Sequence, residues 1–149
     1  MFALLALITL VSGSITDCGA GQGIFTITDL KMDPPSSVAA NQNVSLVLKY
    51  TSPVLVTGGT AKTAITLNFI PFQPSSEDLC TKVFCPVQVG QHDASSFYIF
   101  PSGVSGRIIT EIRWFDLTGR LLLCIKSILT ATGMNHNRTG SLWNIKPSK

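Results

Sequence analysis

The chain has 149 residues, which is enough for one domain with its own core and too few for two domains with a cleft between them. Only 13% of the residues are charged and 45% are apolar, which excludes a disordered chain, a coiled coil and a helical bundle laced with salt bridges. The net charge of +3 comes from scattered basic residues, so no nucleic-acid partner is expected.

The first segment is an apolar run at residues 2–11 (FALLALITLV), which has the length of the hydrophobic region of a signal peptide. It is too short to span a bilayer, which takes about twenty residues. Because no basic residue precedes Asp17, the positive start of a signal peptide is missing, and a buried N-terminal strand is the alternative. We predict a signal peptide at residues 1–16, cleavage after Gly13 and before Asp17, and a secreted protein.

The body of the chain, residues 17–131, predicts strands. Residues 44–50 alternate apolar and polar side chains with the period of two that is typical of a strand with one wet face. The pattern recurs at 62–72 and 107–116. Residues 116–119 are of types typical of a turn, and they join the strand at 107–116 to a partner strand at 120–128. Shorter strands are expected at 24–28, 54–56, 87–89 and 97–100.

No stretch of the chain shows a helical period, and prolines separate the predicted strands. Seven or eight short strands in a single domain predict an all-β fold, an immunoglobulin-like two-sheet antiparallel β-sandwich. Residues 132–149 are more polar and predict a flexible C-terminal tail.

Four cysteines indicate two disulfides in a secreted chain, and they are Cys18, Cys80, Cys85 and Cys124. Three connectivities are possible. One of them pairs Cys80 with Cys85 in a short local loop and leaves Cys18 for Cys124. Zinc binding is the competing use of these residues, but neither His92 nor His136 stands at ligand spacing from a pair of cysteines, so we expect no metal.

Two triplets have the form of N-glycosylation acceptors, at Asn43 and Asn137. The first has the parity of the wet face of the strand at 44–50. Both fit the secretory route and predict a glycoprotein in which each Asn lies at the surface of the fold.

No catalytic motif emerges. His92 and Asp93 lie among serines, but the chain has no Gly-x-Ser-x-Gly elbow to present a nucleophile. Glu77 and Asp78 are adjacent carboxylates in a segment rich in Pro and Ser, where we expect them to be solvated. We therefore predict that the protein is not an enzyme and uses no cofactor.

Several short motifs in order resemble the ML domain (MD-2-related lipid-recognition) family, which includes the Niemann-Pick type C2 protein, the ganglioside GM2 activator and phosphatidylglycerol/phosphatidylinositol transfer proteins. The resemblance spans about residues 17–130. The motifs are Asp17-Cys-Gly19, Asp33-Pro-Pro35 leading to Asn43-Val-Ser-Leu46, Cys85-Pro-Val-Gln-Val-Gly90 and Gly119-Arg-Leu-Leu-Leu-Cys-Ile-Lys126.

A first-to-last bridge and a hairpin bridge recur in that family, which supports pairing Cys18 with Cys124 and Cys80 with Cys85. Many sterol-carrier-like members have a third bridge soon after the first strand, whereas residues 34–41 here contain no cysteine. Sterol is therefore not the default ligand.

The resemblance implies a secreted or endosomal-lysosomal protein that holds the hydrocarbon part of a phospholipid, glycolipid, fatty acid or sterol in an apolar cavity between its sheets. It implies transient contact with membranes and leaves a protein receptor open as a partner. The loops at 53–56 and 100–104 are expected to form the mouth. The side chains expected to line the cavity are Leu46, Leu48, Tyr50, Ile65, Leu67, Phe69, Phe97, Ile99, Ile108, Ile112 and Trp114.

Two alternatives stay open from the sequence. One is a secreted recognition or adhesion module, or an immune co-receptor, in which the same side chains fill a solid core. The other is a secreted hydrolase that uses His92.

Overall fold

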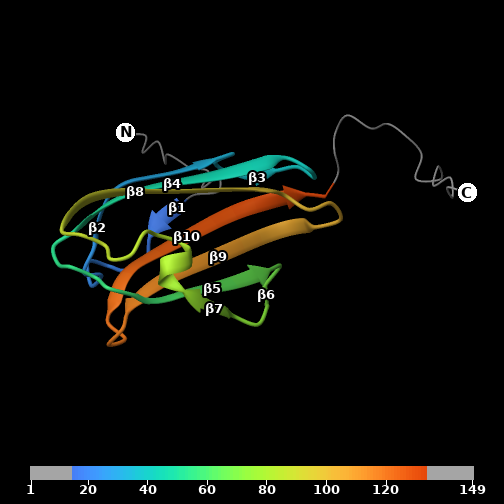
Figure 1. The fold of residues 1–149 in the computed structure, drawn as a ribbon. Helices are drawn as coiled ribbons and strands as arrows, with labels where there is room; N and C mark the ends of the chain where they lie inside the picture. The colour runs from blue at the N-terminus through green and yellow to red at the C-terminus, as the bar shows by residue number, and fades with distance from the viewer. Residues whose placement is uncertain (1–14, 134–149) are drawn as a thin grey trace, which may run out of the picture.

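The computed structural model describes residues 15–133. Figure 1 shows two layers of strands that face each other. The elements follow one another in the order β1 (Ile15–Asp17), β2 (Thr26–Asp33), β3 (Ser37–Val38), β4 (Asn43–Ser52), β5 (Gly59–Leu67), β6 (Ile70–Pro71), β7 (Ser75–Asp78), the 3-10 helix η1 (Leu79–Thr81), β8 (Gly90–Ile99), β9 (Ser105–Asp116) and β10 (Leu121–Thr132).

The larger sheet has seven strands in the order β1-β10-β9-β5-β6, with β3 beside β10 and β7 beside β5. The smaller sheet has the order β2-β4-β8. All neighbouring strands are antiparallel except β3 and β10, which are parallel. The fold is therefore the predicted all-β sandwich of two sheets. Within residues 15–133, no helix is long and apolar enough to cross a membrane.

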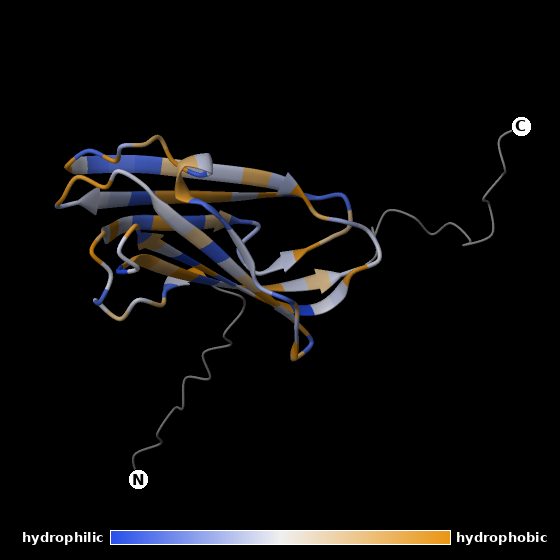
Figure 2. Ribbon diagram, turned by 60° about the horizontal axis from the view of Figure 1, so that its bottom comes forward, coloured by the Kyte–Doolittle hydropathy of each residue, from blue (hydrophilic) through white to orange (hydrophobic). Residues whose placement is uncertain are grey.

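Strand register decides which side chains face the space between the sheets. In the smaller sheet Leu46 of β4 lies opposite Ser96 of β8. In the larger sheet Ile112 of β9 lies between Thr63 of β5 and Ile125 of β10. Because successive side chains point to opposite faces, these positions set the inner faces of β4, β5, β8, β9 and β10 in this region. Figure 2 shows the resulting alternation of hydrophilic and hydrophobic residues along the strands.

The interior contains two clusters of buried apolar residues. In the larger cluster the Tyr50 ring stacks on Phe25 with centroids 4.9 Å apart and meets the edge of Trp114 at 5.8 Å. The smaller cluster consists of Val38, Val44, Phe100, Leu129 and Ala131. By alternation, Thr110 and Ser127, which pair across β9 and β10, face inward between the clusters.

Two disulfides connect distant and local parts of the chain. Cys18 is bonded to Cys124 and ties the end of β1 to β10, and Cys80 is bonded to Cys85 in the loop that begins at η1. Both bridges confirm the expected pairing.

The strand expected at 62–72 is interrupted. β5 ends at Leu67, because Asn68 and Phe69 adopt positive φ angles of 48° and 70° and turn the chain into β6. The Asn68 side chain fixes this turn by donating to the Ser105 carbonyl (3.1 Å) and accepting from the Arg107 amide (2.9 Å). The strands expected at 54–56 and 87–89 are reduced to a single bridge between Val56 and Val87.

Several strands were not predicted in full, and β1, β7 and β8 are examples of strands that are short or polar. β1 begins at Ile15, inside the segment assigned to the signal peptide, and pairs with β10. β7 is the segment that contains Glu77 and Asp78, and β8 extends the strand expected at 97–100 back to Gly90. The rest of the signal peptide and residues 134–149 of the tail lie outside the described residues.

Candidate functional site

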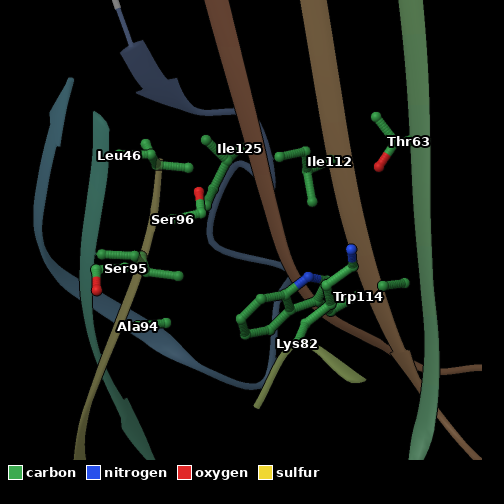
Figure 3. Close-up of a pocket in the computed structure, with 11 residues that line it drawn as sticks. Leu46, Thr63, Lys82, Ala94, Ser95, Ser96, Ile112, Trp114 and Ile125 are labelled. Atoms are coloured by element: carbon green, nitrogen blue, oxygen red, sulfur yellow. The ribbon is translucent and has the colours of Figure 1, made fainter. Parts of the chain in front are cut away.

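A cavity of about 170 Å³ lies between the two sheets on the side where β5 and β8 face each other. Figure 3 shows side chains from the two sheets on opposite sides of this space. The residues that line it are Leu46, Leu48, Ala61, Thr63, Lys82, Ala94, Ser95, Ser96, Ile112, Trp114 and Ile125.

The floor of the cavity is apolar. Leu46 and Leu48 come from β4, Ile112 and Trp114 from β9, and Ile125 from β10. Leu48, Trp114 and Ile125 are buried, so the floor is continuous with the larger cluster. An engineered apolar cavity of roughly 150 Å³ stays dry and binds benzene. The floor therefore has room for a ring or a short stretch of hydrocarbon.

The rim of the cavity is polar. It consists of Thr63 on β5, Ser95 and Ser96 on β8, and Lys82 just after η1, with Ser95, Ser96 and Lys82 exposed at the surface. The Lys82 ammonium pairs with the Glu77 carboxylate at 2.5 Å. The cavity thus passes from an apolar floor to a rim with hydroxyl groups and one cation.

Four of the expected residues line the cavity: Leu46, Leu48, Ile112 and Trp114. Tyr50 lies deeper, in the larger cluster, where burial raises the pKa of its hydroxyl.

Three other expected residues lie on the inner face beyond the cavity, toward the smaller cluster. Leu67 and Ile108 pair across β5 and β9, and Ile108 packs against the smaller cluster. Ile65 has the inward parity of Thr63 but is 41% exposed, because the sheets are open on this side.

The placement of Phe69, Phe97 and Ile99 in the cavity was wrong. Phe69 lies in the turn after β5 and is 82% exposed. Phe97 lies opposite Ser45, and Ile99 opposite Asn43, so both point away from the larger sheet and are exposed. Residues 97–99 are all apolar, so alternation could not show which of them faces inward.

The loops expected to form the mouth do not line the cavity. Neither 53–56 nor 100–104 contributes a residue to it. Phe100 is buried in the smaller cluster, whereas Val54 and Leu55 are exposed.

The lining residues that were not predicted are Ile125 and the small and polar ones: Ala61, Thr63, Lys82, Ala94, Ser95 and Ser96. The alternation in β5 already gave Thr63 the parity of Ile65. The position of Lys82 depends on the path of the η1 loop, for which the sequence carries no periodic signal.

The remaining predicted residues have definite positions. Asn43 is exposed at the start of β4, while Asn137 and His136 lie outside the described residues. His92 donates from Nε2 to the Gln88 carbonyl at 2.6 Å and stacks on Tyr50 at 5.4 Å. Among residues 15–133, no group of three His, Cys, Asp or Glu side chains could hold a metal ion.

A family model of the ML domain matches residues 12–131. The chain belongs to the ML domain family. A curated relative from Dictyostelium discoideum, named "Putative phosphatidylglycerol/phosphatidylinositol transfer protein", is 26% identical over 133 residues, which cover 84% of this chain and 94% of the relative.

Solved structures share the fold of this ML domain. A Niemann-Pick type C2 protein from the Japanese carpenter ant superposes with a TM-score of 0.64 at 16% identity, covering 79% of this chain and 98% of that one. Chicken MD-1, complexed with lipid IVa, has a TM-score of 0.52 at 14% identity, covering 76% and 85%. The cavity of this chain therefore lies within the fold that these solved structures share.

Proposed function

We propose that this ML domain binds the hydrocarbon part of a lipid in the cavity between its sheets and carries the lipid between membranes. The observation that supports the proposal most strongly is the apolar floor formed by Leu46, Leu48, Ile112, Trp114 and Ile125. The name of the Dictyostelium relative favours a phospholipid, and chicken MD-1, which shares the fold, has been solved in complex with lipid IVa.

Burial of hydrocarbon provides the affinity. Each buried CH2 group contributes about 0.8 kcal/mol relative to water. A bilayer offers an acyl chain nearly the same gain, so exchange between bilayer and protein is close to thermoneutral. This balance suits a carrier, because the protein both takes up and releases its lipid.

A long acyl chain needs more room than the cavity provides. Beyond the cavity, toward the smaller cluster, Ile65 of β5 and Tyr98 of β8 have inward parity but are 41% and 50% exposed. We propose that the rest of the chain lies along this open side, against Ile65 and Tyr98. Burial of these two side chains in the lipid complex is then part of the binding energy.

The disulfides and the family support a proposal for the compartment. Two disulfides with no free cysteine among the described residues fit an oxidising environment. We propose that the protein is secreted or resides in the endosomal-lysosomal lumen, and that Asn43 carries a glycan.

The test is uptake of a fluorescent fatty-acid probe, together with native mass spectrometry of the purified protein. Ala94 lines the cavity and is half-buried, so Ala94→Leu should fill part of it. We expect weaker probe uptake with equal or higher thermal stability. If the wild-type protein takes up no probe and no lipid co-purifies with it, the proposal is wrong and a recognition module is favoured.

A further inference from the structure

We propose that Lys82, with the hydroxyl groups of Thr63 and Ser96, forms a headgroup site for an anionic group, so that the ligand is an amphiphile with a carboxylate or phosphate headgroup. The inference rests on the proposed function, because the hydrocarbon part of the same ligand occupies the cavity floor. It adds a chemical class of lipid that the apolar floor alone does not select.

Lys82 is distinguished from the other basic residues by its position. Within residues 15–133 it is the only Lys or Arg that lines the cavity. Lys62, the basic residue next to the lining position Thr63, points to the outer face, where its Nζ lies 5.2 Å from the centroid of the Phe115 ring. Arg113, next to the lining residue Ile112, also points outward and pairs with Glu111.

The backbone on both sides of Lys82 is held in place. Leu79 is fully buried in the larger cluster, and its carbonyl accepts from the amides of Lys82 (2.9 Å) and Val83 (3.1 Å). The Asp78 carboxylate accepts from the Cys80 amide at 2.8 Å, and the bond between Cys80 and Cys85 closes the loop. A cation on a constrained loop loses less conformational freedom when it binds an anion.

In the structure, the Glu77 carboxylate is the anion that pairs with the Lys82 ammonium. The Glu77 and Lys82 side chains are 53% and 45% exposed. An ion pair as exposed as this one contributes little to stability. A lipid headgroup that replaces the Glu77 carboxylate therefore meets only weak competition, and Glu77 remains in solvent.

The hydroxyl groups extend the site across the rim. Thr63 belongs to β5 in one sheet and Ser96 to β8 in the other, and both line the cavity with Lys82. Figure 3 shows Lys82 among these residues and the apolar floor. Carboxylate and phosphate groups accept several hydrogen bonds, and those from a cation are the strongest. The rim thus offers donors to an anion while the floor accepts its hydrocarbon.

The experiment compares two ligands with the same chain, palmitate and methyl palmitate, in displacement of a fluorescent probe at pH 7.4. We expect Lys82→Met to raise the Kd of palmitate about tenfold, because one charge-assisted contact is lost. The Kd of methyl palmitate should not change. Lys82→Arg should restore palmitate binding. Lys62→Met is the matched control, because it removes the same charge from the outer face and should change neither Kd.

A second arm identifies the anion. A phosphate whose headgroup carries no cation of its own is present in phosphatidylglycerol but not in phosphatidylcholine. If the site takes such a phosphate, Lys82→Met should slow the transfer of phosphatidylglycerol from vesicles and leave the transfer of phosphatidylcholine unchanged. If only palmitate responds to Lys82→Met, the site takes carboxylates. Glu77→Gln removes the competing carboxylate and should tighten the binding of whichever anionic ligand responds.

The outcomes separate this inference from the proposed function. If the wild-type protein binds palmitate and methyl palmitate equally, or if Lys82→Met weakens both equally, the headgroup site is wrong and the hydrocarbon cavity stands. If the wild-type protein binds none of the four lipids, the proposed function itself is wrong. Unchanged thermal melting of the variants shows that a change in Kd does not arise from unfolding.

Discussion

Ile112 is part of the cavity floor, and its neighbour Arg113 points to the opposite face of β9. We predict that Ile112→Arg abolishes lipid uptake or folding, because it places a charge without a partner among apolar side chains, at a cost of about 3–5 kcal/mol. Arg113→Ala should change stability by less than about 1 kcal/mol, since the Arg113 side chain is exposed. Thermal denaturation and probe uptake measure both. Similar losses in the two variants would contradict the assigned faces of β9.

Single residues also show what sequence alternation can resolve. Leu46, Leu48, Ile112 and Trp114 stand in segments where polar and apolar residues alternate, so their inward direction could be predicted. Phe97 belongs to an unbroken apolar run, in which only the pairing of β8 with β4 determines the inner face.

Phe69 was misplaced for a different reason. It continued the alternation of β5, but its positive φ places it in a turn, a conformation that is uncommon for an aromatic residue. The Asn68 contacts to Ser105 and Arg107 that accompany this turn are tertiary, and a sequence pattern does not contain them.

Among the elements, the turn between β9 and β10 depends on one carboxylate. Asp116 accepts from the side chain and amide of Thr118 and from the amide and Nε of Arg120, at 2.7–2.9 Å. These bonds, with the Thr118 hydroxyl contributing most, lower the pKa of Asp116 from 3.8 to about 2.

We predict a pH effect from this turn. Because the folded-state pKa lies below the unfolded one, the contribution of Asp116 to stability is complete above about pH 4 and is lost as the pH falls toward 2. Asp116→Asn should therefore flatten the dependence of the free energy of unfolding on pH between 4 and 2. Urea denaturation across this range measures the slope. An unchanged slope in Asp116→Asn would contradict the assignment.

The two disulfides constrain loops of very different length. Cys18 and Cys124 are separated by 106 residues, and Cys80 and Cys85 by 5. The chain-entropy relation gives stabilisation of about 5 and about 2 kcal/mol, respectively. We predict that the Cys18→Ser/Cys124→Ser variant loses more thermal stability than Cys80→Ser/Cys85→Ser. The reverse order in calorimetry would show that the short loop carries more of the native packing than its length suggests.

The long central strands could be predicted from the sequence, whereas the edge strands β7 and β8 could not be predicted in full. The segments that became β4, β9 and β10 carry strong apolar patterns because both neighbours in the sheet and the opposite sheet surround them. β7 is fully exposed and most of β8 is polar, so hydrophobic periodicity does not mark them. Because β8 borders the cavity, the rim residues Ser95 and Ser96 could not be predicted from periodicity.

The two sides of the molecule differ. On one side β1 and β3 flank β10, and the disulfide between Cys18 and Cys124 ties the edge of the sheet. On the other side β5 and β8 are not hydrogen-bonded to each other. If the protein carries lipid as proposed, we expect the lipid to enter through the second side, where the cavity lies. The loop closed by Cys80 and Cys85 lies there, since Lys82 lines the cavity. That side should therefore meet the membrane.

Phe84 is the side chain in this loop that is suited to the bilayer. It is 99% exposed and stands two residues after Lys82, whose charge is attracted by anionic lipids. Inserting a Phe side chain into the bilayer gains roughly 1.5–3 kcal/mol. We predict that Phe84→Ser weakens binding to vesicles by at least about tenfold, since about 1.4 kcal/mol corresponds to a factor of ten, and slows lipid transfer.

The affinity of Phe84→Ser for a probe in solution should stay unchanged, because Phe84 does not line the cavity. Leu117→Ser is the control: Leu117 is also an exposed apolar residue, but it lies in the turn between β9 and β10. Vesicle co-sedimentation and transfer between donor and acceptor vesicles measure the two variants. If both substitutions slow lipid transfer equally, any exposed apolar side chain supports membrane binding, and the open side has no special role in it.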